Sequence, residues 1–248
     1  MGGWAKKCTF GMRVEIKVVA GRTTSTMNAL DPRLSRRGFL STLATAATAT
    51  AGGLALPGLA QAELVCEDWP GQRVCEAGIP SRLIGTSAIR NEQYQSQWCW
   101  AACIAMVFAY HGHPVSQSRI VREAFGAIAD VRGTPEMILS QLNRDWVDDA
   151  DRPFRATSSF GGTTPEAAAY DLVDDHPLII GTQGHAVVLT SLSYRFVESA
   201  YGVVTQLLSA KVRDPWPGVG RRFLRPDEWA TINFAAHVRV ESLERPIF

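Results

Sequence analysis

One segment of this 248-residue chain carries its strongest structural signal: it reads QYQSQWCWAACIAMVFAYHG, from Gln93 to Gly112. The segment begins polar, but residues 98–109 contain no charged side chain, and good helix formers such as Ala and Met fill them. A helix that is apolar on all sides belongs inside a folded core, and twelve residues are too few to cross a bilayer. We therefore expect a buried central helix that ends at Tyr110-His111-Gly112.

Three further helices are expected downstream of this segment. Ser116 can cap a helix that runs to about Phe125. Thr134-Pro135-Glu136 and Thr164-Pro165-Glu166 each offer a capping hydroxyl, a proline at the first helical position and an acid at the positive end of the helix dipole. The helix after residue 164 should run to about Val173. The helix after residue 134 should bury one face, made of Ile138, Leu142 and Trp146.

Beyond Pro177 the pattern changes to short runs rich in β-branched residues, which favour strands. Helices followed by a set of neighbouring strands predict an α+β fold. In this fold a helical lobe, with the cysteine-bearing helix at its centre, packs against a mostly antiparallel sheet. The expected strands cover residues 178–181, 186–190, 194–197, 203–208 and 236–240, with a turn near residues 200–202.

Residues 1–62 have the features of an export signal. Ser35-Arg36-Arg37-Gly38-Phe39-Leu40 places paired arginines before an uncharged, mildly hydrophobic stretch, which ends in the small residues of Ala60-Gln61-Ala62. The pattern resembles a twin-arginine signal peptide. This resemblance implies cleavage after Ala62 and a periplasmic or secreted protein without stable membrane association. We expect Met27 to be the true start. The alternative is an uncleaved membrane anchor, against which Pro57 and the threonines of the stretch argue.

The distribution of charge bears on the choice of partner. Residues 1–62 hold eight of the 25 Lys and Arg and two of the 24 Asp and Glu. The remaining residues carry 17 basic and 22 acidic side chains, a net charge of −5, which gives no general attraction for a phosphate backbone. We expect a monomer that acts on a protein or peptide and does not bind nucleic acid.

Two of the four cysteines after residue 62 are expected to pair. Cys66 and Cys75 flank a Pro-Gly turn, and in an oxidising compartment they should form a disulfide within a short N-terminal extension, residues 63–83. The alternative is a metal site, although no His or Cys pattern completes one. Cys99 and Cys103 lie four residues apart on one helical face, where their sulfurs do not bond easily. We expect neither a metal nor an organic cofactor.

Cys99 is the candidate nucleophile. It stands where the central helix begins, and the positive end of the helix dipole favours the thiolate there. Gln93 precedes it by six residues and Trp100 follows it. This pattern of a glutamine, five residues and Cys-Trp resembles the papain-like cysteine peptidases. The sequence from Gln97 to Ala102 most resembles bacterial members of this family, including plant-pathogen effector proteases and the peptidase domains of bacteriocin exporters.

The resemblance covers residues 84–240 and implies a papain-like peptidase domain over residues 84–248. It gives the amide of Gln93 and the backbone N–H of Cys99 the role of donors to the oxyanion of the tetrahedral intermediate. Gln95 and Gln97 are the alternatives to Gln93, as polar residues of the same loop.

A cysteine nucleophile needs a general base, and His185 is the candidate. Gly184 precedes it and the apolar strand of residues 186–189 follows it, which resembles the Gly-His-Ala strand of the same family. The other four histidines are given structural places: His111 and His113 at a solvated helix end, His176 in a loop, and His237 in a late strand without a companion signal.

Asp214 is the candidate acceptor for the imidazole, in the position where the bacterial branches of the family carry an acid. It lies 29 residues after His185, and a hairpin centred on Tyr201 would bring the two together. The alternative role for Asp214 is that of a turn acid before Trp216. Together the residues predict an exported thiol peptidase with a Cys99-His185-Asp214 triad. A deamidase or acyl transferase of the same fold, or an inert binding module, is the alternative.

Overall fold

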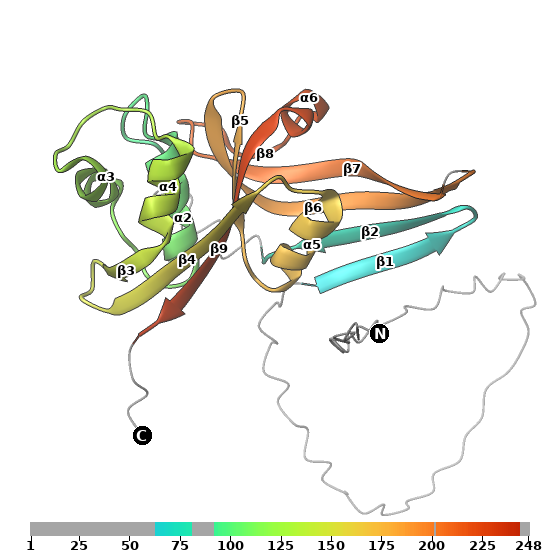
Figure 1. Ribbon diagram of the computed structural model, residues 1–248, viewed down its shortest axis with the longest axis horizontal. Helices are drawn as coiled ribbons and strands as arrows, with labels where there is room; N and C mark the ends of the chain where they lie inside the picture. The colour runs from blue at the N-terminus through green and yellow to red at the C-terminus, as the bar shows by residue number, and fades with distance from the viewer. Residues whose placement is uncertain (1–62, 81–91, 201, 244–248) are drawn as a thin grey trace, which may run out of the picture. The chain divides into compact units, whose positions relative to one another are not determined.

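The computed structural model describes residues 63–80, 92–200 and 202–243 (Figure 1). The expected twin-arginine signal, its cleavage after Ala62, the start at Met27 and the boundary between residues 83 and 84 lie outside these residues.

A single sheet forms the framework of the described part of the chain. Its strands run in the order β1-β2-β6-β5-β9-β4-β3, while β7 pairs with β6 and β8 pairs with β7. Every pairing between these strands is antiparallel. The strands are β1 (Glu63–Trp69), β2 (Gln72–Gly78), β3 (Arg144–Val147), β4 (Pro153–Gly161), β5 (Leu178–Thr182), β6 (His185–Ser199), β7 (Gly202–Asp214), β8 (Gly220–Phe223) and β9 (Ile232–Ser242).

The long strand β6 joins the two parts of this sheet. Its first residues pair with β5, its later residues pair with β2, and β7 follows nearly its whole length on the opposite edge. Residues 186–190 and 194–197, expected as two strands, are therefore parts of one. The β1–β2 hairpin, expected as a separate short extension, continues the same sheet through β2.

The helices that we expected are present. Thr134 and Thr164 cap their helices by accepting a hydrogen bond from the N–H groups of Met137 and Ala167. Ser116 precedes a helix too, but its side chain makes no capping hydrogen bond. In Figure 1 the first three helices gather at one end of the sheet, and β1, β2, β6 and β7 extend toward the other end. The helices are α2 (Cys99–Tyr110), α3 (Gln117–Phe125), α4 (Pro135–Leu142), α5 (Pro165–Val173) and α6 (Pro226–Ala230).

Helix α2 is the buried central helix that the sequence predicts. All of its residues from Cys99 to Phe108 are buried. Phe108 packs edge-on against Trp146 and Phe154, with ring centroids 5.6 and 5.0 Å apart. Since the helix is surrounded by core side chains, its N-terminal end is held in a fixed position against β6.

The helical place expected for Trp146 is wrong. Helix α4 ends at Leu142, and Trp146 lies in β3, where it pairs with Phe154 of β4. Its indole N–H still donates to the carbonyl oxygen of Gln141, and its side chain is buried. A buried residue four positions after Leu142 fits the helical period, but the pairing of β3 with β4 buries it equally well.

The described residues thus form an α+β fold with an antiparallel sheet. None of the helices within residues 63–80, 92–200 and 202–243 is long and apolar enough to span a membrane.

Candidate active site

Cys99 occupies the first position of α2, with 8% of its surface exposed. The N-cap residue Trp98 makes no side-chain capping hydrogen bond, so the N–H groups of the first turn direct their positive partial charge toward the thiol. The backbone N–H groups of Trp100 and Ala186 and the ring of His185 interact with the sulfur and favour its ionised form. The start of α2 and the start of β6 therefore meet at this sulfur.

A tight turn places His185 at the beginning of β6. Gln183 and Gly184 connect β5 to β6 with φ angles of 49° and 79°. Two successive residues with positive φ are typical of the two-residue hairpin turn whose twist matches that of the flanking strands. Thr182 pairs with His185 across this turn. The register of the hairpin thus fixes the backbone of His185 at the end of the sheet that faces Cys99.

Asp214, at the end of β7, is the hydrogen-bond acceptor for His185. Its Oδ1 lies 2.7 Å from Nε2 of His185 and also accepts a hydrogen bond of 2.9 Å from the backbone N–H of Trp216. The pairing of Val188 with Arg213 brings the end of β7 beside the start of β6, across 29 residues of sequence. One carboxylate therefore makes both contacts that the sequence suggests for Asp214, one to the imidazole of His185 and one to the turn before Trp216.

These contacts shift the pKa of each group of the candidate triad. Burial opposes ionisation of Cys99, but the hydrogen bonds from His185, Ala186 and Trp100 outweigh it and lower the pKa of the thiol below 9.0. Burial alone would lower the pKa of His185, yet Asp214 and Cys99 raise it to about 9. Burial raises the pKa of Asp214, but its bonds to His185, Trp216 and Arg222 outweigh burial and hold the pKa below its usual value. The arrangement favours a thiolate, an imidazolium and a carboxylate.

A second ion pair, which sequence reasoning missed, supports Asp214. The Nε of Arg222 donates to Oδ2 of Asp214 at 2.8 Å, and its two terminal nitrogens donate to the two carboxylate oxygens of Glu228 at 2.8 Å each. Glu228 is 5% exposed, and its bonds to Arg222 overcome the effect of burial and lower its pKa. Nothing local in the sequence marks Arg222, because it bonds to residues of other elements; Glu228 has a local signal as the acid that caps α6 after Pro226, but this does not reveal its bond to Arg222.

Helix α6 contacts the histidine side of the site as well. The hydroxyl group of Thr182 donates to the backbone carbonyl of Glu228 at 2.6 Å. Since Thr182 is the partner of His185 in the β5–β6 hairpin, α6 is bonded to the strand that pairs with His185 and, through Arg222, to Asp214.

Gln93 lies near the site, but its amide is already engaged. Its backbone N–H donates to the carbonyl oxygen of Pro215 at 2.8 Å, which ties the loop before α2 to the residue after Asp214. Its side chain is buried, and Nε2 donates to the carbonyl oxygens of Gln95 and Ser96 at 3.0 Å each. Both amide hydrogens therefore point into the loop. To donate to an oxyanion, the amide must release one of these two bonds.

Cys103 is buried one turn along α2 and is not bonded to another cysteine. Burial raises the pKa of its thiol well above the usual value, and the charges of Cys99 and Asp214 add to this effect. Cys66 and Cys75, in contrast, are joined by a disulfide across the β1–β2 hairpin.

The expectation that His113 is a solvated residue is wrong. His113 is 7% exposed, its ring stacks on Phe154, and its Nδ1 lies 3.1 Å from Oδ2 of Asp148. The backbone N–H of His113 bonds back to the carbonyl oxygen of Phe108, so the chain folds under the end of α2 instead of leaving into solvent.

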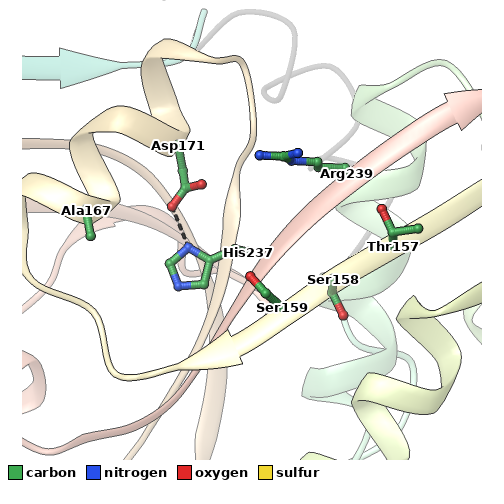
Figure 2. A pocket seen from close by; sticks show the side chains of 7 residues that line it. All are labelled: Thr157, Ser158, Ser159, Ala167, Asp171, His237 and Arg239. Carbon is green, nitrogen blue, oxygen red and sulfur yellow. Dashed lines mark hydrogen bonds and ion pairs between the residues drawn. The ribbon is translucent and has the colours of Figure 1, made fainter. Parts of the chain in front are cut away.

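His237 has a companion after all, in Asp171 of α5. Figure 2 shows the Nδ1 of His237 directed at the carboxylate of Asp171, in a surface pocket of about 560 Å³ between α5 and the strands β4 and β9. The sequence does not reveal this pair, because 66 residues separate its members. The structure does not bring it together with Cys99, so it forms a separate cluster. The pocket is lined by Thr157, Ser158, Ser159, Ala167, Asp171, His237 and Arg239.

Of the four sequence-predicted site residues, His185 bonds to Asp214 and interacts with Cys99, and Gln93 lies in the adjoining loop. Among the described residues, no group of three or more His, Cys, Asp and Glu side chains is arranged to hold a metal ion. Comparison of the chain with models of protein families, with curated proteins and with solved structures found no match.

Proposed function

We propose that the chain is an exported papain-like cysteine peptidase that hydrolyses peptide bonds. One observation carries the proposal: the ring of His185 bonds through Nε2 to Asp214 at 2.7 Å, and the same ring interacts with the thiol of Cys99, whose pKa it lowers. Because Asp214 occupies Nε2, the nitrogen left for the thiol is Nδ1. A nucleophile, a base and an orienting acid in this order are the requirements of acyl transfer.

The proposed reaction begins from the thiolate and the imidazolium. The sulfur attacks the carbonyl carbon of the substrate, an S–C bond forms, and the carbonyl oxygen takes the negative charge. His185 gives its proton to the nitrogen of the leaving amine as the C–N bond breaks, which leaves a thioester. The neutral imidazole then takes a proton from water, whose oxygen attacks the thioester. The acid leaves, and the thiolate and imidazolium are restored.

Stabilisation of the oxyanion is assigned to the backbone N–H of Cys99 and to the amide of Gln93. The first turn of a helix leaves its N–H groups without intrahelical acceptors, so the Cys99 N–H is available. The amide of Gln93 becomes available when it exchanges one of its bonds to the loop carbonyls for a bond to the substrate oxygen.

The direct test is hydrolysis of casein and of model amides by the purified mature protein, beside Cys99→Ala and the matched control Cys103→Ala. Cleavage that is lost in Cys99→Ala and kept in Cys103→Ala supports the proposal. Modification of Cys99 by an alkylating reagent without any cleavage would favour a deamidase or acyl transferase, which needs the same three side chains. Equal reactivity of Cys99 and Cys103 would favour an inert module.

We further propose that the protein is exported by the twin-arginine route and acts in the periplasm or outside the cell. The paired arginines Arg36 and Arg37 support this route, and the Cys66–Cys75 disulfide supports the destination, because disulfides persist mainly in oxidising compartments. N-terminal sequencing of the exported protein tests the proposal. A start earlier than Ala60 would contradict cleavage after Ala62.

A further inference from the structure

The loop of residues 126–134 is attached to the residues that precede and begin α2. The indole N–H groups of Trp98 and Trp100 donate to the carbonyl oxygens of Ala129 and Val131, at 2.8 and 3.2 Å. These bonds fix the loop backbone on both sides of residue 130, next to the helix end that carries Cys99.

Asp130 provides a second attachment. Its Oδ1 accepts a hydrogen bond from the backbone N–H of Gln97 at 2.8 Å, and its Oδ2 accepts one from the hydroxyl group of Ser96 at 2.8 Å. Both oxygens of this carboxylate are therefore used to hold the loop against the segment before Cys99.

Gly133 brings the loop into direct contact with α2. A Cβ atom at this position would lie 2.6 Å from Cγ of Trp100, which is closer than real atoms approach. The backbone of residue 133 therefore rests on the indole ring. Together with the hydrogen bonds above, this contact fixes the backbone of the loop on both sides of Arg132.

Arg132 lies between the two segments that carry the nucleophile and the base. Its Nε donates to Oε1 of Gln97, two residues before Cys99, at 3.3 Å. Its Nη1 lies 3.4 Å from the position that a Cβ atom would take at Gly184, the residue directly before His185. The guanidinium group thus stands beside both halves of the candidate site.

The positive charge of Arg132 is not compensated by the described residues. The side chain is exposed and forms no ion pair with any carboxylate in the described ranges. The nearby carboxylate of Asp130 bonds to Ser96 and Gln97 instead, and Asp214 bonds to His185 and Arg222. With Nε used by Gln97, both terminal nitrogens remain as a fork suited to a carboxylate.

We propose that Arg132 is the centre of a carboxylate-binding subsite beside Cys99, and that substrates carry Asp or Glu close to the bond that is cleaved. The identity of the substrate rests on the proposed peptidase function. The subsite itself does not, because the guanidinium group lies beside the segments before Cys99 and His185 whatever reaction these residues perform.

The first test therefore uses two alkylating reagents of similar size, iodoacetate and iodoacetamide. In both reactions the thiolate of Cys99 forms an S–C bond and iodide leaves, but iodoacetate carries a carboxylate. We expect Arg132→Gln to lower the ratio of the iodoacetate rate to the iodoacetamide rate about two- to fivefold, as for an exposed charge pair. Arg132→Glu should lower it further, and 1 M salt should reduce the differences because it screens charges beyond about 3 Å.

Arg239→Gln is the matched control. Arg239 is also exposed and forms no ion pair with a described carboxylate, so its replacement removes the same charge from the protein (Figure 2). It lies on β9, seven residues from Ile232, and Ile232 pairs with Thr182 beside the candidate site. Seven residues of a strand span about 23 Å, so Arg239 is far from the site. The control should keep the wild-type ratio. An unchanged ratio in both Arg132 variants, or an equal loss in Arg239→Gln, overturns the subsite. An unchanged iodoacetamide rate shows that the site itself is intact.

The second test profiles cleavage of a proteome-derived peptide library by mass spectrometry. We expect the wild-type protein to cut beside Asp or Glu more often than chance, and Arg132→Glu to shift this preference toward Lys or Arg. If both proteins cleave peptides with no preference for acidic or basic residues beside the cleaved bond, the acidic preference is overturned. If no peptide is cleaved by any variant, the peptidase function and this substrate class fail, whereas the carboxylate subsite is still decided by the alkylation ratio.

Discussion

His185 and Asp214 are joined by a contact of 2.7 Å between Nε2 and Oδ1, although 29 residues separate them in the chain. The contact is made inside a larger network, because Oδ2 of the same carboxylate bonds to Arg222, which bonds in turn to Glu228. Because each side chain of this network is hydrogen-bonded to the next, the effect of replacing one of them on its neighbours can be predicted.

Replacing Arg222 with Gln is expected to destabilise the protein by about 3 kcal/mol, because removing one partner of a buried ion pair leaves uncompensated charge on the carboxylates of Asp214 and Glu228. Arg225→Gln is the control. Its guanidinium group lies 3.6 Å from the same Glu228, but its side chain is 59% exposed, and such exposed pairs contribute about 1 kcal/mol or less. Urea unfolding measures both variants, and equal losses would contradict the buried role of Arg222.

Turnover is expected to fall as the pH rises through about 9, the pKa of His185, because the imidazole then lacks the proton that the leaving amine needs. Asp214→Asn removes a carboxylate that raises this pKa, so the alkaline limb of the profile should move to lower pH. Alkylation of Cys99 should not fall above pH 9, since it needs only the thiolate. An alkaline limb at the same pH in the wild-type protein and in Asp214→Asn would contradict the effect of Asp214 on the pKa of His185.

The same pKa shift affects stability. The pKa of His185 is higher in the folded protein than its usual 6.5, so the contribution of its ion pair is present below about pH 6.5 and is lost as the pH rises through about 9. The wild-type protein should lose more free energy of unfolding between pH 6.5 and 9.5 than His185→Gln. Parallel curves for the two proteins would be evidence against this linkage.

Iodoacetamide at neutral pH is expected to modify Cys99 and to leave Cys103 unmodified. The pKa of Cys99 is lowered by His185 and by two backbone N–H groups, whereas burial raises the pKa of Cys103 well above its usual value. Peptide mapping by mass spectrometry measures both sites. In urea the two thiols should react at similar rates, which controls for the intrinsic reactivity of each peptide.

Gln93→Ala is expected to lower kcat about 100-fold if its amide stabilises the oxyanion, as for the removal of one oxyanion donor. Iodoacetamide labelling of Cys99 should continue in this variant, because displacement of iodide forms no oxyanion. Gln97→Ala is the control, since the side chain of Gln97 bonds to Ser96 and Arg132 within the same loop. A larger loss of kcat in Gln97→Ala than in Gln93→Ala would transfer the role to Gln97.

Several helices and strands of this fold can be predicted from short stretches of sequence. The uncharged run after Trp98 predicts the buried helix, and the Thr-Pro-Glu triplets at residues 134 and 164 predict two capped helices. Gly184 before His185 predicts the start of a strand. These features depend on helical period, capping and turn geometry, which involve residues within a few positions of one another.

The partners of the polar side chains were decided by long-range pairing. Trp146 fits a helix by its spacing, and the pairing of β3 with β4 made it a strand residue. His113 and His237 carry no local sign of their acids, which lie 35 and 66 residues away. Arg222 likewise carries no local sign of its partners, although together with Glu228 it holds the acid of the candidate triad.

Local chemistry therefore predicted four of the helices and several of the strands, and the resemblance to papain-like peptidases named Cys99, His185 and Asp214 as candidates. Tertiary structure assigned their geometry: which nitrogen of His185 meets Asp214, where the amide of Gln93 donates, and that Arg132 stands at the candidate site. The physical reason is that a helix cap or a tight turn is formed by neighbours in the chain. The position of a side chain across a sheet depends instead on the register of strands that meet only when the whole core packs.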